Sequence, residues 1–218
     1  VRLNCETHLK ANHFFANLKA LLFVQMFFHE DIYRSEVEQT ATALQRELGE
    51  QVLGDYGHFE LSTAYHAKFL EDLLDIRCLL DNGLEANDAF RLKKLSSTID
   101  NILPKMTAWS KAMSHRGEIS NFSDGGAALP APLAKIMKFI TAHYPQLLND
   151  ISLPIYLTTD KTAGRILDLT YSGYTVLENS MSKVILDNAE FGAKVNPGHG
   201  HADIGSFEYS FGGARLVS

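Results

Sequence analysis

The hydrophobic periodicity of this chain changes once, between residues 145 and 160, and that change limits the folds it can adopt. Before it, apolar residues recur every three or four positions over long stretches, as in amphipathic helices. After it, apolar runs are short, rich in β-branched and aromatic residues, and separated by turn sequences. Helices followed by strands indicate an α+β multidomain chain. We therefore expect a helical domain over residues 1–150 and a β domain over residues 151–218.

The helical part is expected to contain several long helices with recognisable ends. Ser35 is expected to cap the second helix, and Asn82-Gly83 to end the third. Pro104 is expected to kink or interrupt the fourth, because proline lacks the amide hydrogen that a helix interior needs. The expected helices are residues 4–29, 35–53, 62–81, 87–113 and 132–143.

The second part is expected to form short strands joined by turns such as Ser172-Gly173 and Gly212-Gly213. So few strands without further partners would leave an open sheet edge. We therefore expect the chain to be a piece of a longer protein. The expected strands are residues 155–157, 166–169, 174–177, 184–186, 206–211 and 214–217.

Charge and hydropathy exclude two classes of partner. The formal net charge is −6 over 218 residues and no basic run is present, which argues against a nucleic-acid surface. The longest apolar stretch, residues 18–28, contains Lys19 and Gln25 and is too short and too polar to span a membrane. No pattern in the sequence specifies an oligomeric state.

A glycine-rich stretch, residues 197–203, carries two histidines and an aspartate at alternate positions. In an extended segment His199, His201 and Asp203 would point to the same face. That arrangement suits a metal ligand beside a catalytic base, with a carboxylate orienting the ligand. A polar loop with two surface histidines explains the same spacing equally well.

A second polar group lies in residues 57–66, where a loop leads into a helix. Free amide groups at a helix N-terminus attract anions, so these residues can form an anion-binding site. The alternative is ordinary helix capping by Ser62. The polar residues concerned are His58, Glu60, Tyr65 and His66.

A third polar group lies in the first helix. His13 and Asn17 are four residues apart and share a helix face, with Asn12 about 100° round the axis. Either the group forms a site, or its members satisfy one another inside the core.

Together these motifs resemble the heparinase II/III-like family of polysaccharide lyases. The matching segments are Ala11 to Leu21 (ANHFFANLKAL), Gly57 to His66 (GHFELSTAYH), Leu70 to Asp75 (LEDLLD) and Pro197 to Phe211. The resemblance implies an incomplete α/α toroid followed by the start of an antiparallel β-sandwich, with the active site in the cleft between them.

The resemblance also implies β-elimination on a uronic-acid-containing polysaccharide. Asn12 matches the residue that neutralises the uronate carboxylate, with His13 assisting it. Tyr65 matches the catalytic tyrosine, an acid that can also serve as base, and His199 the catalytic histidine. We expect the remaining polar residues of these motifs to bind substrate: Asn17, His58, Glu60 and His66.

The family further implies zinc and a location outside the cytoplasm. His201 matches a zinc ligand, but the next ligand would fall at Ser218 or beyond, so the ligand set is incomplete in this chain. Where relatives have Arg-Ser-Pro-Met before the tyrosine, this chain has Leu61 to Ala64, a change expected to affect specificity. The acidic polysaccharide partner implies a periplasmic, secreted or cell-surface protein.

Two other functions remain open. A toroid glycoside hydrolase would need two opposed carboxylates, for which Glu60, Asp72 and Asp75 are candidates without an obvious pair. A non-catalytic glycan-binding protein that takes part in surface-polysaccharide handling would keep the fold and the cleft but not the chemistry.

Overall fold

The computed structural model describes residues 11–28, 31–82, 86–123, 132–149, 153, 164–192 and 201–218. Their contacts divide the chain into two compact units, which are described one at a time. The first comprises Val1–Gln51 and Phe69–Leu103, and the second Val52–Lys68 and Pro104–Ser218. The expected strand 155–157 and the motif residues 197–200 lie outside the described residues.

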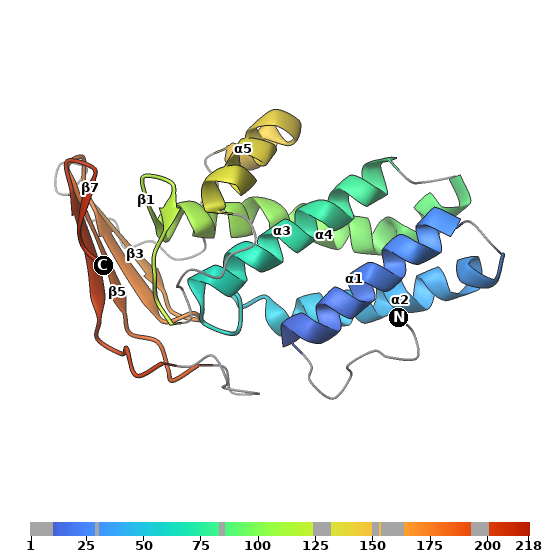
Figure 1. Ribbon diagram of the computed structural model, residues 1–218, viewed down its shortest axis with the longest axis horizontal. Coiled ribbons are helices and arrows are strands. Elements are labelled where there is room, and N and C mark those ends of the chain that lie inside the picture. The colour runs from blue at the N-terminus through green and yellow to red at the C-terminus, as the bar shows by residue number, and fades with distance from the viewer. Residues whose placement is uncertain are drawn as a thin grey trace. The chain divides into compact units, whose positions relative to one another are not determined.

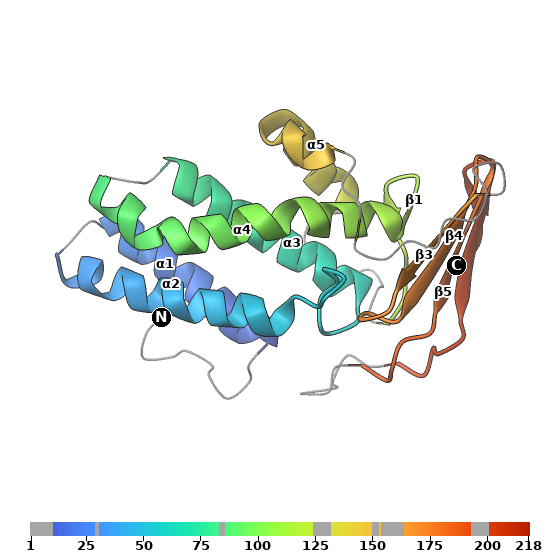
Figure 2. The ribbon, with the colours of Figure 1, turned by 180° about the vertical axis from the view of Figure 1, so that it is seen from behind.

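The first unit is built from α1 (Ala11–Phe28), α2 (Asp31–Gln51), and parts of α3 (Thr63–Asn82) and α4 (Ala86–Ala112). Helices α1 and α2 pack side by side (Figures 1 and 2). The rings of Phe15 and Phe69 lie 4.5 Å apart between α1 and α3. Apolar residues of these four helices form the core of the unit, including Leu22, Leu44, Leu73 and Leu95.

Two details of the expected helices are wrong. Helix α2 begins at Asp31, so Ser35 lies inside it and does not cap it. Residues 31–34 contain no glycine or proline, so nothing in their sequence prevents the helix from beginning before Ser35. Helix α4 continues through Pro104 to Ala112, so the expected interruption is wrong, whereas the alternative of a kink stays a prediction. The buried side chains of Met106 and Trp109 stabilise this last stretch, which offsets the cost of an internal proline, about 3 kcal/mol.

The second unit contains a five-stranded antiparallel sheet in which each strand pairs with the next along the chain (Figure 1). Leu167, Val176 and Ile185 are aligned across neighbouring strands and point to one buried face. The five expected strands that the structure describes are confirmed, except that β6 begins at Phe207 and not at Ser206. They are β3 (Arg165–Leu169), β4 (Tyr174–Glu178), β5 (Ser182–Asp187), β6 (Phe207–Phe211) and β7 (Ala214–Val217).

One hydrophobic cluster joins this sheet to the end of α4 and to α5 (Leu133–His143), which is followed by a 3-10 turn, η2 (Pro145–Leu148). Trp109 and Tyr174 meet edge to face at 6.0 Å, and Phe122 lies 5.4 Å from Tyr174. Aromatic pairs of this kind add to the burial energy of their rings. No helix in the described ranges is long and apolar enough to cross a membrane.

A short hairpin that the sequence analysis did not predict follows α4. Strands β1 (Ser114–His115) and β2 (Glu118–Ile119) pair in antiparallel fashion. Arg116 and Gly117 turn the chain between them with φ values of 51° and 85°. Two successive positive φ angles are typical of the tight turns that connect hairpin strands.

Candidate functional site

Two of the sequence motifs meet at Ser120–Ser123, which we call the junction segment. The hydroxyl of Thr63, at the start of α3, donates to the carbonyl of Ser120 at 2.5 Å. The backbone amide of Ser123 donates to Oδ2 of Asp203 at 2.7 Å. Since Thr63 belongs to the motif 57–66 and Asp203 to the motif 197–203, the fold of the second unit brings both motifs to the same four residues.

The first turn of α3 carries Tyr65, whose side chain is half-buried. Ser62 caps the helix, because its Oγ accepts from the amide of Tyr65 at 3.4 Å. The preceding residue, Leu61, has a φ of 56°, and its carbonyl accepts from the hydroxyl of Tyr174 at 2.6 Å. The capping interpretation is therefore confirmed, and it also fixes the backbone from which Tyr65 projects.

The loop that contains His201 is tied to β5 by backbone hydrogen bonds. The amide of Gly205 donates to the carbonyl of Asp187 at 2.7 Å, and the amide of Asp187 to the carbonyl of Ser206 at 3.0 Å. His201 is exposed, and Asp203 is partly buried. His199 lies outside the described residues, so its catalytic role stays a prediction.

Asp203 of this loop interacts electrostatically with a second acidic group, Asp187, and with the phenol of Tyr174. Burial and, to a smaller extent, the charge of Asp203 raise the pKa of Asp187 to about 6, despite a hydrogen bond from the amide of Ala189 that lowers it. Burial, with the charges of Asp187 and Asp203, raises the pKa of Tyr174 well above its usual value. Tyr174 therefore stays protonated and acts as a hydrogen-bond donor.

The predicted substrate-binding residues His58, Glu60 and His66 are all buried. His66 stacks on Trp109 with ring centroids 4.0 Å apart, and its Nε2 lies 3.0 Å from Oγ of Ser110. Burial lowers the pKa of both histidines to about 3, so both are neutral at physiological pH. This placement puts the three side chains in the interior of the protein, and their direct contact with substrate stays a prediction.

Asp55, which lies outside the motifs named in the sequence analysis, organises the start of the loop that leads into α3. Its Oδ1 accepts from the amide of Gly57 at 3.0 Å. Its Oδ2 accepts from the amide and hydroxyl of Ser172 at 2.7 and 2.8 Å. The spacing Asp-x-Gly is a signal for such a turn, but its partner in the β3–β4 turn has no sequence signal.

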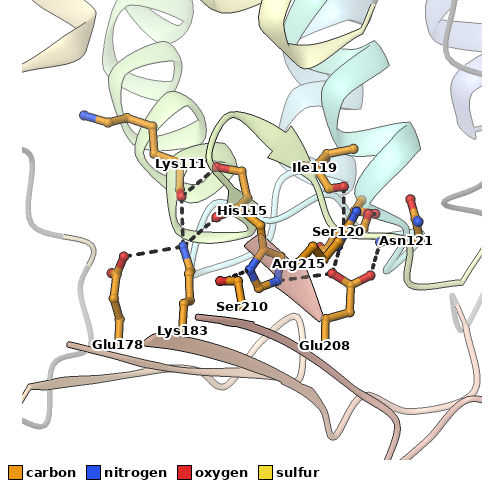
Figure 3. A network of polar contacts seen from close by, with 12 residues as sticks. Lys111, His115, Ile119, Ser120, Asn121, Glu178, Lys183, Glu208, Ser210 and Arg215 are labelled. Carbon is orange, nitrogen blue, oxygen red and sulfur yellow. Dashed lines mark hydrogen bonds and ion pairs between the residues drawn. The ribbon is translucent and has the colours of Figure 1, made fainter. Parts of the chain in front are cut away.

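A buried ionic network joins the hairpin to the sheet (Figure 3). His115 lies between Ser210, 2.8 Å from its Nδ1, and Glu208, 3.2 Å from its Nε2. Glu208 also pairs with Arg215 and accepts from the amide of Asn121 at 2.7 Å. Burial opposes ionisation of Glu208, but these three donors together lower its pKa. The carboxylate thus links the sheet to the junction segment.

Lys183 caps the C-terminal end of α4 from the sheet. Its Nζ donates to the carbonyls of Ser114 at 2.8 Å and Lys111 at 3.3 Å (Figure 3). A cation at this end of a helix is favoured by the helix dipole. Burial lowers the pKa of Lys183 to about 8, although Glu178, 3.9 Å away, partly opposes this effect.

The first unit holds the third motif. Asn12 is half-buried and His13 exposed, and Asn17 donates from Nδ2 to the carbonyl of His13 at 2.7 Å within α1. The expectation that these residues share a cleft with Tyr65 stays a prediction.

The carboxylates considered for a hydrolase have a different partner. Lys19 Nζ lies 2.7 Å from Oδ1 of Asp72 and also pairs with Asp75. Burial alone would lower the pKa of Lys19, but its hydrogen bonds to both aspartates raise it. These carboxylates therefore stabilise the packing of α1 on α3.

Zinc requires several ligands at one point, usually four. Among the residues that the structure describes, no three histidine, cysteine, aspartate or glutamate side chains gather in this way. Asp203 is already engaged by the amide of Ser123. The described residues thus do not form a zinc site by themselves, and a zinc role for His201 stays a prediction.

Comparisons with known proteins agree with this architecture. Residues 162–218 match the family model described as heparinase II/III-like, C-terminal. None of the curated proteins compared with the chain matches it.

Solved structures match over nearly the whole chain. A crystal structure of heparinase III superposes with a TM-score of 0.63 and 18% identity, over 94% of this chain and 34% of that one. A second heparinase III structure gives 0.61 and 18%, over 98% and 33%. Heparan sulfate lyase HepC from Pedobacter heparinus gives 0.57 and 16%, over 94% and 32%. The chain thus spans about a third of the length of these proteins.

The α+β fold class, an incomplete toroid followed by the start of a β-sandwich, is confirmed by these structures. The chain thus carries a segment similar to the heparinase II/III-like C-terminal family at residues 162–218, and it shares its fold with heparinase III structures over nearly its whole length.

Proposed function

We propose that this chain is part of a polysaccharide lyase that cleaves a uronic-acid-containing polysaccharide by β-elimination. The observation that carries the proposal is the convergence of two motifs on the junction segment, through Thr63 at the start of α3 and Asp203 beside His201. The family match over residues 162–218 and the likeness in fold to heparinase III and HepC support it.

The chemistry assigns a role to each motif. Removal of the proton at C5 of the uronate places negative charge on its carboxyl group, which Asn12, assisted by His13, would stabilise by hydrogen bonding. His199 or Tyr65 would take the C5 proton. The C4–O4 bond then breaks, Tyr65 gives a proton to the leaving oxygen, and a C4=C5 double bond remains.

The substrate class follows from this reaction, because only an acidic sugar with a leaving group at C4 can be cleaved in this way. Heparan sulfate is the substrate that the name of HepC states for that protein, and for this chain glycosaminoglycans and alginate-like polymers are both candidates. Since such polymers occur outside the cytoplasm, we place the protein in the periplasm, at the cell surface or in the medium.

Hydrolysis has less support in the structure. A glycoside hydrolase needs one carboxyl group as acid and another as base or nucleophile. Of the three candidates, Asp72 and Asp75 are paired with Lys19, and Glu60 is buried. These carboxylates are better explained as stabilising groups.

The experiment is an assay of the full-length protein against uronate polysaccharides, with absorbance of the unsaturated product as readout. Tyr65→Phe removes the proton donor and keeps the ring, so turnover should fall at least about 100-fold while binding persists. Tyr171→Phe is the matched control, because Tyr171 is an exposed tyrosine in the β3–β4 turn.

The outcomes separate the three functions. Loss of turnover in Tyr65→Phe alone supports the lyase. Chain cleavage without the unsaturated product indicates a hydrolase. Binding of a uronate polysaccharide with no cleavage by the wild-type protein indicates a glycan-binding protein and contradicts the lyase proposal.

A further inference from the structure

We propose that the junction segment sets the position of Tyr65 relative to the loop of His201, and that Thr63 and Glu208 are positioning residues for the reaction. The inference rests on the proposed function, because it assigns the segment a role at that same site. The segment itself supplies mainly backbone groups, which is why no sequence motif marks it.

The connection to Tyr65 passes through Thr63. Thr63 is fully buried, lies two residues before Tyr65 in the first turn of α3, and bonds to the carbonyl of Ser120. A first turn is otherwise free to fray, because its amides lack partners within the helix. The Thr63 hydroxyl therefore fixes the part of α3 that Tyr65 projects from.

The connection to the His201 loop passes through Ser123. Its amide donates to Asp203, and its side chain bonds to Tyr174, whose hydroxyl also donates to Leu61. Ser123 has a φ of 54°, an uncommon value for a residue other than glycine. The surrounding hydrogen bonds hold this conformation, which aims the amide of Ser123 at Asp203.

The segment itself is anchored to the sheet by Glu208 and by Phe122. The carboxylate of Glu208 accepts the amide of Asn121, and the ring of Phe122 packs beside Tyr174 in the core. Arg215, which pairs with Glu208, also donates to the carbonyl of Ile119 at 3.2 Å. Each residue from Ile119 to Ser123 thus contacts another part of the second unit. A displacement at the Thr63 contact is therefore passed along the segment to the Asp203 contact.

The size of the effect follows from the demands of catalysis. A displacement of about 1 Å in a reacting group can cost about 100-fold in rate. Removing the Thr63 hydroxyl, which bonds to the junction segment, should therefore lower kcat. KM should change little, because the groups that bind the polysaccharide remain.

The test uses Thr63→Val, which keeps the shape of the side chain and removes its hydroxyl. Thr63→Ser restores the hydroxyl, and Thr141→Val is the matched control, because Thr141 donates to a backbone carbonyl in α5 at 2.8 Å. We expect kcat of Thr63→Val to fall at least about tenfold, with KM within about twofold. Thr63→Ser should recover most of the activity, and Thr141→Val should match the wild type.

A second measurement does not depend on activity. Hydrogen exchange of the backbone amides should accelerate in Thr63→Val both at the start of α3 and in residues 201–206, and in neither place in Thr141→Val. Acceleration confined to α3 would overturn the inference. If the wild-type protein performs elimination, an unchanged kcat of Thr63→Val would overturn it as well. Absence of elimination from the wild type would contradict the proposed function alone, and the exchange pattern would still decide whether the segment couples the two motifs.

Discussion

Nε2 of His115 lies 3.2 Å from Oε2 of Glu208, and both side chains are only 3% exposed. This pair fixes a hairpin of two-residue strands onto the sheet at a point where an apolar contact would be expected. The turn of the hairpin is held as well, because Arg116 donates to the carbonyl of Gly212 at 2.9 Å. The hairpin is therefore attached both through strand β1 and through its turn.

Glu208→Gln should lower the free energy of unfolding by about 2–4 kcal/mol. The change leaves buried His115 and partly buried Arg215 without the negative charge that they share, and removal of one partner from a buried ion pair is strongly destabilising. Urea denaturation of the two proteins measures the difference. Glu178→Gln breaks the more exposed pair with Arg165 and should cost less than about 1 kcal/mol. Equal losses in the two variants would contradict the assignment.

The acid side of the stability profile should depend on His66. Burial lowers its pKa to about 3 in the folded state from an ordinary 6.5, so between these values only the unfolded chain takes up the proton. Stability is thus complete above pH 6.5 and falls as the pH falls toward 3, by about 1.4 kcal/mol per pH unit for each such proton. His58 contributes in the same direction.

His66→Gln should make this fall shallower by about the contribution of one proton, about 1.4 kcal/mol per pH unit between pH 4 and 6. Denaturation at a series of pH values measures the slope. A slope as steep as that of the wild type would show that His66 is protonated in the folded protein, in conflict with its buried position.

Gly173 and Gly117 provide a matched pair for backbone strain. Both have positive φ, 77° and 85°, but a Cβ on Gly173 would lie 2.3 Å from Cα of Ala189, whereas around Gly117 nothing lies within 4 Å. Gly117→Ala should therefore cost about 1 kcal/mol, for the dihedral alone, and Gly173→Ala at least about 3 kcal/mol. Similar thermal unfolding shifts in both would show that the β3–β4 turn, or the segment after β5 that contains Ala189, moves to accept the new atom.

The long elements were predictable because their periodicity extends over many residues. The hairpin at residues 114–119 was not, since two strands of two residues are too short to show alternation. In β6 the alternation predicts a strand but not its buried face. Glu208 and Ser210 point inward, while Phe207 and Phe211 are 49% and 48% exposed. Only the tertiary partners, His115 and Arg215, explain that choice.

The candidate site likewise contains some groups that the sequence reveals and others that it does not. Tyr65, His201 and Asp203 carry chemistry that a sequence motif can reveal. The junction segment acts through the carbonyl of Ser120 and the amides of Asn121 and Ser123. These are backbone groups, which almost any residue type would supply. Its role appears only when the fold brings residues separated by 57 and 80 positions together.

Asp187 should give the stability profile a slope opposite to that of His66. Its pKa is raised to about 6 from 3.8, so between these values the folded chain keeps a proton that the unfolded chain has released. Stability therefore falls as the pH rises through this window and is constant above it. Asp187→Asn removes the titration, and its oxygen can still accept from the amide of Ala189. The variant should be about 1–2 kcal/mol more stable than the wild type at pH 7 and nearly equal to it at pH 4. Urea denaturation at both values measures this difference, and a variant less stable at pH 7 would show that the charged form of Asp187 is needed where it lies, between the sheet and the loop of His201.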